Sequence, residues 1–422
     1  MICDSPRLDS GLRILISAYT CNPYQGSEHA VGWGFIHELA QRHHLCVIAE
    51  EENCREPIEK YLQAFPRLRE RIEFHFIPKK RRPLLRKVWP PSYYRYYRKW
   101  HESAFDLATK LHAEKPFDLA HQLTMVGYRE PGYLWKLGIP FVWGPIGGMG
   151  AFPWRFMPSL GAYGLAYYTA YNFINFWQER FSKRPRMAAQ VAGKALISAT
   201  PSDQEGTLKF WGQPSHLLAE VGLPGAIRTK ATARAKGEPL RIVWSGLHIP
   251  RKALPLGLHA LAALPESMNW TLDILGQGPK TASWKKLALR LGVFSRCRFH
   301  GWIERDEALD VMHSAHVMLI TSLRDLTSTV TAEALAEGLP VVCLDHCGFS
   351  AAVDERSGIK VQVTSPKKAI TDLRDAMLSL DAEDLRWRLA QGALLRAQDF
   401  DWRRKVDCLE KIYLEALRTK VR

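Results

Sequence analysis

The chain contains eight cysteines in 422 residues, and no two of them form a CxxC pair. Structural zinc sites usually need two such ligand pairs, and disulfide frameworks are typical of small secreted domains rather than of long chains. The tightest cluster, Cys343 and Cys347 in CLDHC, has no second pair of ligands at a suitable spacing. We therefore expect free or buried thiols, no disulfide framework and no metal cofactor.

An apolar leader and an uninterrupted membrane span are also missing. The first residues, MICDSPRLDSGLR, contain acids and no apolar run, so we expect no secretory signal and a cytoplasmic location. The stretch 156–178 is uncharged and long enough to cross a bilayer, but proline, glycine and asparagine residues interrupt it. We interpret 156–178 as an interfacial or substrate-lining element.

Several catalytic signatures are absent as well. The sequence has no P-loop and no Ser-His-Asp order. No GxGxxG follows the first expected strand, which argues against a Rossmann oxidoreductase. The one DxD pattern, Asp399 to Asp401, opens an expected helix, where capping explains the carboxylates better than metal binding does.

Positive charge is in excess, with a formal net charge of +15, while 46% of the residues are hydrophobic. The apolar fraction is that of a folded protein, and the length suits two domains. The charge favours anionic partners such as nucleotides, phosphorylated sugars, nucleic acid or an acidic membrane face.

One segment, 79–100, holds nine basic residues, six Trp or Tyr residues and no acid. A solvated helix and loop would account for this composition. A surface for anionic lipid headgroups would account for it too, since Lys and Arg bind phosphate and aromatic rings favour the interface. Nucleic acid is the third alternative, but no nucleic-acid-binding motif accompanies the segment.

Short apolar runs alternate with helical periodicity along the chain, which predicts βαβ units and parallel sheets. We therefore predict an α/β fold made of two Rossmann-like, doubly wound domains. The expected strands are 12–19, 45–50, 72–78, 117–123, 139–145, 240–246, 270–276, 297–301, 316–322, 340–345 and 359–363.

The join between the two patterns is the segment 222–239, which is rich in Gly, Pro and Ala and has no strand or buried-helix pattern. We predict an N-terminal domain over 1–221, a C-terminal domain over 222–398 and a final helix over 399–422. In the final helix, apolar residues recur at helical spacing after a suitable N-cap, Asp401.

The stretch DLTSTVTAE places Asp325 and Glu333 between an expected strand and an expected helix. In a parallel α/β sheet such a loop lies at the carboxyl edge, where ligands bind. The amides of Ser328, Thr329 and Val330 would lie at the helix N-terminus, which attracts anions. Glu333 is placed to reach ribose hydroxyls and Asp325 to bind a sugar, although helix capping explains Asp325 equally well.

The complete pattern resembles the family-4 retaining glycosyltransferases of the GT-B fold. In that family two acids flank seven residues before a helix and an AxGxPVV strand, and Ala336, Gly338, Pro340 and Val341 match this tail. The first acid is here Asp325 in place of the usual Glu. The resemblance covers nearly the whole chain and implies two facing Rossmann-like domains, with the C-terminal helix crossing back to the first domain.

In the second domain the resemblance implies a site for the diphosphate of a nucleotide sugar. Lys252 would pair with the diphosphate, with Arg251 beside it and Gly246 at the end of the preceding strand. The Arg that usually follows this glycine is replaced by Leu247. Either His248 or another cation substitutes for it, or Lys252 and main-chain amides suffice.

Two further segments of the second half fit the resemblance. Main-chain groups around Trp302 and Ile303, in the FHGWIERDEAL segment, would bind the nucleotide base. The run 276–279, GQGP, would form a loop beside the nucleotide, while as a dinucleotide fingerprint it lacks the third glycine.

In the first domain, the loop CNPYQGSEHA resembles the first strand-to-helix loop of the family. There Gly26 and Ser27 would let the backbone approach the diphosphate or the sugar, and Glu28 would lie near the acceptor. His121 ends an expected strand and, by the resemblance, would lie over the donor sugar. Without the resemblance, a lone His is more often structural than catalytic.

The predicted function is transfer of a sugar, with retention of configuration, from a UDP- or GDP-sugar to a saccharide or lipid-linked saccharide. The expected catalytic residues are His121, Asp325 and Lys252, and no metal is required. The resemblance implies a role in cell-surface polysaccharide synthesis, such as lipopolysaccharide or exopolysaccharide, at the inner face of the membrane. The alternatives are a nucleotide-sugar epimerase or hydrolase of the same fold, and a non-catalytic membrane- or nucleic-acid-binding protein that uses residues 79–100.

Overall fold

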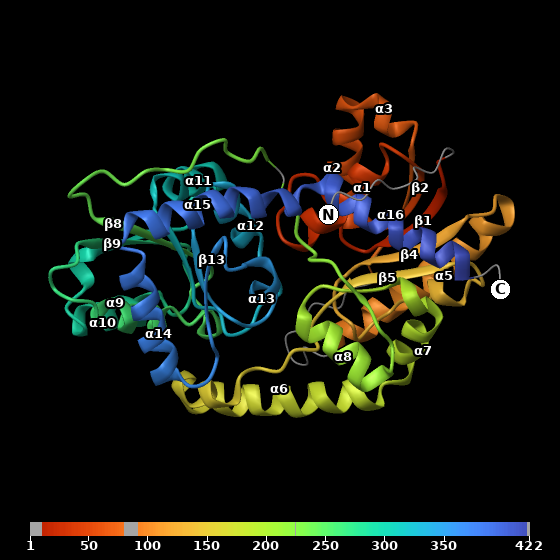
Figure 1. Cartoon of the computed structure of the whole chain (residues 1–422). Helices are drawn as coiled ribbons and strands as arrows, with labels where there is room; N and C mark the ends of the chain where they lie inside the picture. Colours follow the sequence, from red (N-terminus) through yellow and green to blue (C-terminus); the bar gives the residue numbers. More distant parts are fainter. Residues whose placement is uncertain (1–10, 80–91, 224, 420–422) are drawn as a thin grey trace. The chain divides into compact units, whose positions relative to one another are not determined.

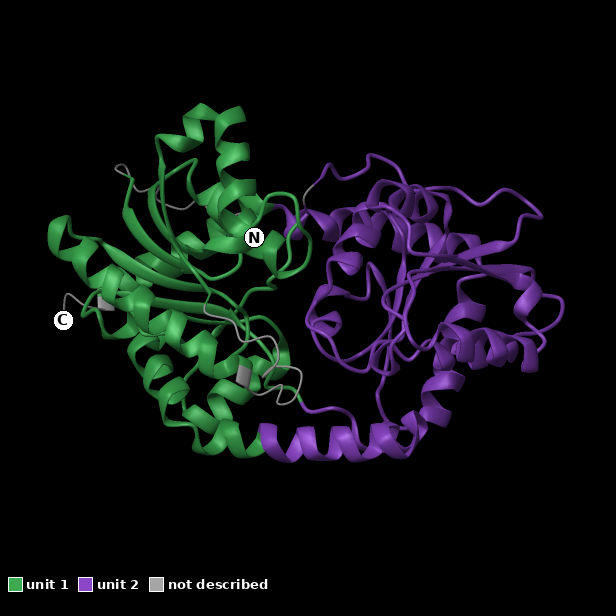
Figure 2. Ribbon diagram, turned by 180° about the vertical axis from the view of Figure 1, so that it is seen from behind, with its two compact units in different colours: residues 1–150, 176–222, 402–422 green, residues 151–175, 223–401 purple. Residues whose placement is uncertain are grey.

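The computed structural model describes residues 11–79, 92–223 and 225–419. The chain forms two compact units (Figure 2). Unit 1 comprises residues 1–150, 176–222 and 402–422, and unit 2 comprises residues 151–175 and 223–401. Most of the basic segment 79–100, for which we considered a membrane-facing surface, lies outside the described residues. Of this segment the structure describes Lys79 and the helix from Ser92 onward.

Unit 1 is built on a parallel seven-stranded sheet with the order β3-β2-β1-β4-β5-β6-β7 (Figure 1). Its strands are rich in buried Ile, Leu, Val and Ala, as expected for a parallel sheet whose two faces are both covered. The strands are β1 Arg13–Ala18, β2 His44–Glu50, β3 Ile72–Ile77, β4 Leu119–Thr124, β5 Phe141–Ile146, β6 Leu196–Ser198 and β7 His216–Leu217.

Two apolar cores fill the two faces of this sheet. One core joins the sheet to α1, α2 and α16, and the other joins it to α5 and α7. The helices of unit 1 are α1 Glu28–Leu39, α2 Glu51–Ala64, α3 Pro66–Arg69, α5 Ser92–Glu114, α7 Lys183–Ala192, α8 Pro201–Trp211 and α16 Trp402–Thr419, with 3-10 turns η1 Leu134–Lys136 and η3 Gly193–Ala195.

Unit 2 has a parallel six-stranded sheet with the order β10-β9-β8-β11-β12-β13. The strands are β8 Leu240–Ser245, β9 Trp270–Leu275, β10 Cys297–Gly301, β11 Val317–Ile320, β12 Val341–Leu344 and β13 Gly358–Val361. Helices α9, α10 and α14 cover one face, and α11, α12 and α15 cover the other (Figure 1). This arrangement is doubly wound, as predicted.

The helices of unit 2 complete its two layers around the sheet. They are α9 Leu254–Ala262, α10 Thr281–Arg290, α11 Arg305–Ser314, α12 Thr329–Ala336, α13 Phe349–Ala352, α14 Pro366–Ser379 and α15 Glu383–Ala397, with 3-10 turns η2 Trp154–Leu160, η4 Pro250–Lys252, η5 Phe294–Arg296 and η6 Gln398–Phe400. Helix α6, Gly161–Phe181, begins in unit 2 and ends in unit 1.

The expected strands are all present, and β6 and β7 are additions among the described residues. The contact-based units differ from the predicted domains in one respect, because residues 151–175 group with the second unit. The physical reason is that Phe152, Phe156 and Tyr168 are buried in the apolar core of unit 2. The final helix, α16, packs on α1 and buries Tyr413 within unit 1.

The described part of the chain contains no helix that combines the length and the hydropathy needed to cross a membrane. Helix α6 covers most of the uncharged stretch 156–178, so this stretch forms a helix without meeting the criteria for a span.

Candidate functional site

The strand order of unit 2 places its ligand-binding edge between β8 and β11. In the sheet, β9 lies on one side of β8 and β11 lies on the other. The loops after β8 and after β11 therefore lead away in opposite directions. In open α/β sheets, ligands bind at the carboxyl ends of the strands that flank such a switch point. Lys252 follows β8 and Asp325 follows β11, so both predicted residues come from these two loops.

Hydrogen bonds hold the two loops together. The hydroxyl of Thr321 donates to the carbonyl oxygen of Lys252 over 2.7 Å, and the same hydroxyl accepts the indole N–H of Trp244 at 3.0 Å. The amide of Leu323 donates to the carbonyl oxygen of Arg251 over 2.8 Å. These bonds fix the backbone from which both basic side chains project toward the loop after β11.

The two predicted cations converge on the predicted carboxylate. Nζ of Lys252 lies 2.5 Å from Oδ2 of Asp325, and Nη1 of Arg251 lies 3.3 Å from the same oxygen. The side chain of Lys252 is 11% exposed and that of Asp325 is 19% exposed. Two cations and one carboxylate leave a net positive charge, so this group can accept a further anion.

The loop continues into the N-terminus of α12. Ser328 is the N-cap, with a positive φ of 69°, and it turns the chain into the helix. The first amides of any helix lack partners within the helix, and the helix dipole adds partial positive charge there. Thr329 and Val330 are only partly buried, so their amides lie close to the solvent-facing end of the helix. The sequence prediction of an anion-binding helix end is therefore consistent with the local geometry.

Glu333 lies one turn into α12 and is 8% exposed. Its Oε1 accepts hydrogen bonds from Nε and Nη2 of Arg305 over 2.9 and 2.8 Å. Arg305 is the first residue of α11 and was not predicted as a site residue. The guanidinium fixes one carboxylate oxygen, while Oε2 of Glu333 makes no hydrogen bond to the described residues and can accept one from a ligand hydroxyl.

A cavity of about 670 Å³ opens at the carboxyl ends of β8, β9 and β10. Its size suits a small ligand. The lining residues are His248, Gly276, Gln277, Gly278, Thr281, Lys285, Phe299, His300 and Gly301. Residues 246–252 form a loop that begins at the wall of this cavity and ends at Lys252. A ligand that extends from the cavity along this loop reaches Arg251 and Lys252.

Two glycines allow the walls of the cavity to approach each other. A Cβ at Gly276, whose φ is 101°, would lie 2.2 Å from the carbonyl oxygen of Gly246. A Cβ at Gly278 would lie 2.7 Å from the carbonyl oxygen of His248. Side chains at these positions are therefore excluded, and the GQG run serves close backbone packing rather than a dinucleotide fingerprint.

His248 does not supply a cation in place of the missing Arg. Its side chain is fully buried, Nδ1 is hydrogen-bonded to Oγ1 of Thr281 at 2.8 Å, and its ring packs on those of Trp244 and Trp284. Burial lowers the pKa of His248 below its usual value, which favours the neutral ring. Leu247 is exposed and uncharged, and the cations that pair with Asp325 are Arg251 and Lys252.

The residues expected to bind the base lie just beyond the cavity wall. Trp302 is 65% exposed and Ile303 is partly buried, directly after β10. Gly301 lines the cavity, whereas the side chains of Trp302 and Ile303 do not. Their role in base binding stays a prediction that rests on main-chain groups.

In unit 1 the switch point lies between β1 and β4, and the loop with Gly26, Ser27 and Glu28 follows β1. Gly26 and Ser27 are exposed, and Ser27 is the N-cap of α1 with a φ of 58°. The Glu28 carboxylate accepts the amide of Val126, just after β4, over 2.5 Å. Burial raises the pKa of Glu28 above its usual value.

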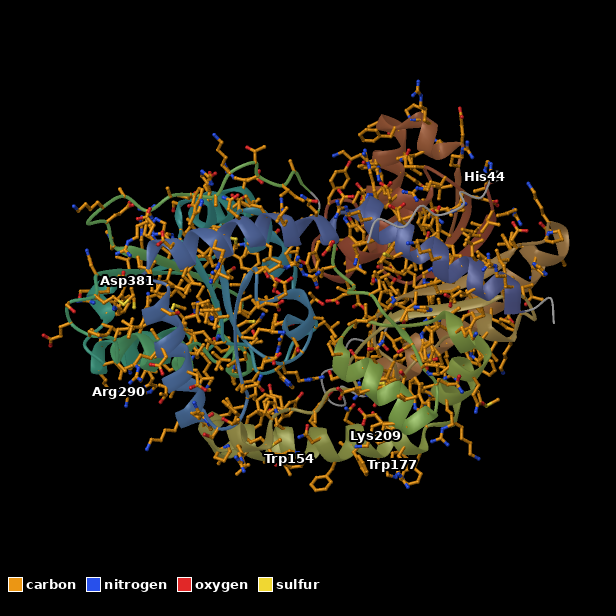
Figure 3. The ribbon with its side chains drawn as sticks, viewed as in Figure 1. His44, Trp154, Trp177, Lys209, Arg290 and Asp381 are labelled. Atoms are coloured by element: carbon orange, nitrogen blue, oxygen red, sulfur yellow. The ribbon has the colours of Figure 1, made fainter. Side chains whose placement is uncertain are left out.

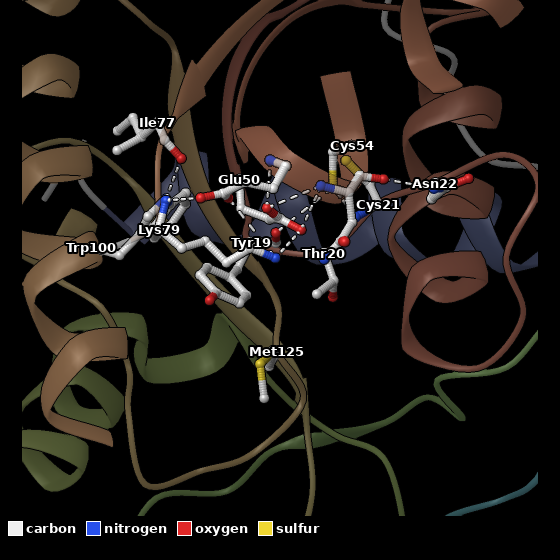
Figure 4. Close-up of polar contacts among 12 residues, drawn as sticks. Tyr19, Thr20, Cys21, Asn22, Glu50, Cys54, Ile77, Lys79, Trp100 and Met125 are labelled. Carbon is white, nitrogen blue, oxygen red and sulfur yellow. Dashed lines mark hydrogen bonds and ion pairs between the residues drawn. The ribbon is translucent and has the colours of Figure 1, made fainter. Parts of the chain in front are cut away.

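The beginning of this loop is anchored to α2 (Figure 4). The Asn22 side chain donates to the carbonyl oxygen of Asn53 over 2.7 Å, and the amide of Cys21 donates to Sγ of Cys54 over 3.5 Å. The buried carboxylate of Glu50 caps α2 and pairs with Nζ of Lys79 over 2.5 Å. These contacts fix the first part of the loop and leave the stretch around Gly26 exposed.

The structure gives His121 a packing position that does not favour its predicted catalytic role. Its side chain is fully buried in β4, where Nδ1 accepts the hydroxyl of Tyr413 at 2.7 Å and Nε2 donates to the carbonyl oxygen of Gly144 at 2.8 Å. Both ring nitrogens are therefore occupied by partners within unit 1. Burial lowers the pKa of His121 to about 4, which keeps the ring neutral.

The buried position of His121 predicts an effect of pH on stability. The ring has a pKa of about 4 in the folded chain and about 6.5 when unfolded, so its contribution is complete above pH 6.5 and is lost as the pH falls through 4. The wild-type chain should lose free energy of unfolding when the pH is lowered from 7.5 to 5. We expect this loss to be about 2 kcal/mol smaller in His121→Ala, because the titrating ring is absent. Denaturant titrations at the two pH values measure it.

His121→Ala should also lower stability at pH 7.5 by about 2–4 kcal/mol, because it leaves a cavity and two unpaired polar groups. Binding of a nucleotide to unit 2 should persist. Unchanged stability together with lost turnover would contradict the structural role and restore the catalytic one.

One group of possible metal ligands occurs in the described part of the chain, on β2 and β3 of unit 1. The ligand atoms of Cys46, Glu73 and His75 lie within 4.8 Å of one another. The guanidinium of Arg13 is 3.8 Å from Glu73, and burial raises the pKa of Cys46 to about 12. Both features disfavour a cation there. Asp399 of the DxD pattern instead pairs with Arg396 at 2.6 Å.

Two doubly wound α/β units, with a C-terminal helix that belongs to the first unit, define the GT-B fold. Solved structures support this class. The chain has a TM-score of 0.64 to the apo form of the lipopolysaccharide outer core galactosyltransferase WaaB, at 12% identity, with 94% of this chain and 99% of that chain covered. The TM-score is 0.58 to Anabaena Alr3699/HepE in complex with UDP, at 14% identity, with 97% and 100% covered. At these identities the likeness shows the fold.

Residues 239–380 match the family model described as Glycosyl transferases group 1. This matched segment lies within the second unit, and the predicted resemblance to GT-B glycosyltransferases is confirmed. The chain is 30% identical over 253 residues to the D-inositol 3-phosphate glycosyltransferase of Streptomyces bingchenggensis (strain BCW-1), which covers 54% of this chain and 55% of the relative. The chain spans about half the length of the curated relatives it matches.

Proposed function

We propose that the protein is a glycosyltransferase that uses a nucleotide-diphosphate sugar, bound mainly by unit 2. The observation that carries this proposal is the convergence of Lys252 and Arg251 at the switch point of a glycosyl transferases group 1 domain, beside the N-terminus of α12. Related structures are described as complexes with UDP and with UDP-glucose, which favours UDP as the first donor nucleotide to test.

In this proposal the donor extends along the edge of the sheet. The base occupies the cavity at β9 and β10, the ribose hydroxyls bind Glu333, and the diphosphate binds Lys252 and the amides of Ser328, Thr329 and Val330. Preorganised donors stabilise the negative charge that develops on a leaving diphosphate, because they need no rearrangement as the bond breaks. Such a site needs no metal ion.

The reaction breaks the bond between the anomeric carbon and the diphosphate oxygen and forms a bond to the acceptor hydroxyl. By analogy with family 4, we propose retention of configuration, with a phosphate oxygen of the donor taking the hydroxyl proton. Asp325 orients the sugar. Unit 1 binds the acceptor through the exposed loop at Gly26 and Ser27, with Glu28 close by.

The acceptor is a saccharide or a lipid-linked saccharide. The basic and aromatic composition of residues 79–100 supports a peripheral location at an anionic membrane. UDP and GDP remain the alternatives for the donor nucleotide. An epimerase or hydrolase of the same fold would need a base or a water-positioning acid, a role that Glu28 can fill, so product analysis separates these activities.

A thermal-shift panel of UDP- and GDP-sugars tests the donor site. We expect one nucleotide series to raise the melting temperature of the wild-type chain, and we expect Glu333→Ala and Lys252→Ala each to remove most of that shift. A shift that persists in both variants would mean that the nucleotide binds elsewhere. No shift with any member would favour the non-catalytic alternative.

A further inference from the structure

Helix α6 has its polarity reversed relative to an ordinary surface helix. Surface helices usually bury their apolar side chains and expose their polar ones. In α6, three polar residues face inward: Asn172, Asn175 and Glu179 are 4%, 2% and 4% exposed. The Asn172 side chain accepts the amide of Phe152 and donates to its carbonyl oxygen, each over 2.8 Å.

The outward face of α6 carries large apolar side chains. The residues that are more than 40% exposed are Tyr163, Leu165, Tyr167, Phe173, Ile174, Phe176, Trp177 and Phe181. Tyr163, Tyr167, Ile174, Trp177 and Phe181 recur at spacings of three, four and seven residues, which aligns them along one side of the helix, and Leu165, Phe173 and Phe176 lie toward one edge of this face. Trp154, just before α6, is 52% exposed and packs edge-to-face on Phe173 at 5.8 Å. Figure 3 shows Trp154 and Trp177 on α6 and the turn before it.

A soluble protein rarely exposes so long an apolar face without a partner. The length and hydropathy of α6 do not suit a membrane span. Aromatic side chains on one face of a helix, with cations near it, are instead typical of helices that lie in the plane of a membrane interface.

The charges around this face favour an anionic surface. Residues 151–181 contain a single carboxylate, Glu179, and it is buried. Arg180 and Lys183 are exposed at the C-terminal end of α6 and just beyond it. Lys209 of α8 is also exposed and lies over the ring of Phe210, which packs on Phe176 at 5.8 Å. Cations at the edge of an apolar face are placed to bind lipid phosphates.

We propose that the exposed apolar face of α6 docks on an anionic lipid bilayer, with the helix parallel to the membrane and its aromatic rings at the level of the headgroups. This surface consists of Trp154 and the exposed residues of α6. The face is distinct from residues 79–100, and the proposal does not depend on glycosyltransferase activity. It places the chain at the surface where lipid-linked saccharides occur.

Vesicle sedimentation with a matched pair of triple variants tests the proposal. The test variant is Ile174→Ser, Trp177→Ser and Phe181→Ser, at positions 55%, 61% and 57% exposed. The control variant is Leu289→Ser, Trp387→Ser and Leu395→Ser, at positions 59%, 44% and 63% exposed on α10 and α15. The probe is a vesicle of phosphatidylglycerol and phosphatidylethanolamine, compared with a phosphatidylcholine vesicle.

We expect the wild-type chain and the control to bind the anionic vesicles and the test variant to bind about 1,000-fold more weakly, because each of the three large apolar side chains removed contributes roughly tenfold. Binding to phosphatidylcholine should be weaker for all three. A second variant, Tyr163→Ser with Tyr167→Ser, should also lose binding, and thermal unfolding of each variant verifies the fold.

Equal vesicle binding by the test variant and the control would overturn the proposal. A concentration-dependent dimer of the wild-type chain that the test variant dissociates, without a change in vesicle binding, would also overturn it, and the face would then join two copies of the chain. Because nucleotide binding is measured separately, failure here leaves the proposed donor site unaffected.

Discussion

Lys252→Met is expected to weaken binding of the donor nucleoside diphosphate by about 10²–10³-fold while leaving binding of the corresponding nucleoside unchanged. The reason lies in the geometry at the switch point. Lys252 is nearly buried and projects from a backbone that Thr321 holds in place, so its ammonium can bind a phosphate with little rearrangement. In the proposed binding mode the nucleoside contacts the cavity at β9 and β10 and the Glu333 carboxylate, and it does not contact this ammonium.

Isothermal titration calorimetry with UDP and uridine, and with GDP and guanosine, measures both affinities. Lys286→Met is the matched control, because Lys286 is exposed on α10 and does not line the cavity. It should bind like the wild-type chain. An equal loss of affinity for nucleoside and diphosphate in Lys252→Met would indicate a general disturbance of the loop instead of a lost phosphate contact.

Asp325→Asn is expected to change binding and turnover in opposite directions. The Asp325 carboxylate occupies both cations in the structure, so an incoming diphosphate has to compete with it for Lys252 and Arg251. A neutral amide of the same shape removes this competition, and diphosphate affinity should stay equal or rise by up to about tenfold. Turnover should fall by about 100-fold, because the sugar loses the group that orients it.

Calorimetry with the diphosphate and a product assay with the donor sugar measure the two effects. Asp310→Asn, a change at a carboxylate in α11, provides the control and should alter neither. If Asp325→Asn weakened diphosphate binding and slowed turnover to the same extent, Asp325 would serve only to hold the two cations in place.

The sequence was sufficient to predict which residues of the proposed donor site lie close together. Apolar runs and helical periodicity located β8, β11 and α12, and parallel sheets place the loops after their strands at one edge. Asp325, Arg251 and Lys252 could therefore be brought together in advance, although 73 residues separate Lys252 from Asp325.

Roles that depend on tertiary packing could not be predicted in this way. His121 follows the expected strand pattern, but its burial depends on Tyr413, which is 292 residues away in α16. His248 next to an exposed Leu247 looked like a replacement cation, yet three aromatic side chains enclose its ring. Arg305 opens α11 with no local signal of its contact with Glu333, because that pair forms across two helices.

The uncharged stretch 156–178 shows a similar limit. Its composition disfavoured a membrane span and favoured an interfacial or substrate-lining element, but it could not reveal which side chains face the protein. The asparagine residues that seemed to interrupt the stretch are the ones buried by contact with the core, as Asn172 shows through its two hydrogen bonds to Phe152. The direction of the aromatic face follows from that packing.

A crystal structure of the chain with UDP, or with GDP if the thermal-shift panel selects it, would locate the diphosphate site. We expect a phosphate within about 3 Å of Nζ of Lys252 and of an amide among Ser328 to Val330, with the base in the cavity at Gly276 and Gly278. A diphosphate bound away from Lys252, with the Lys252–Asp325 pair intact, would contradict this expectation.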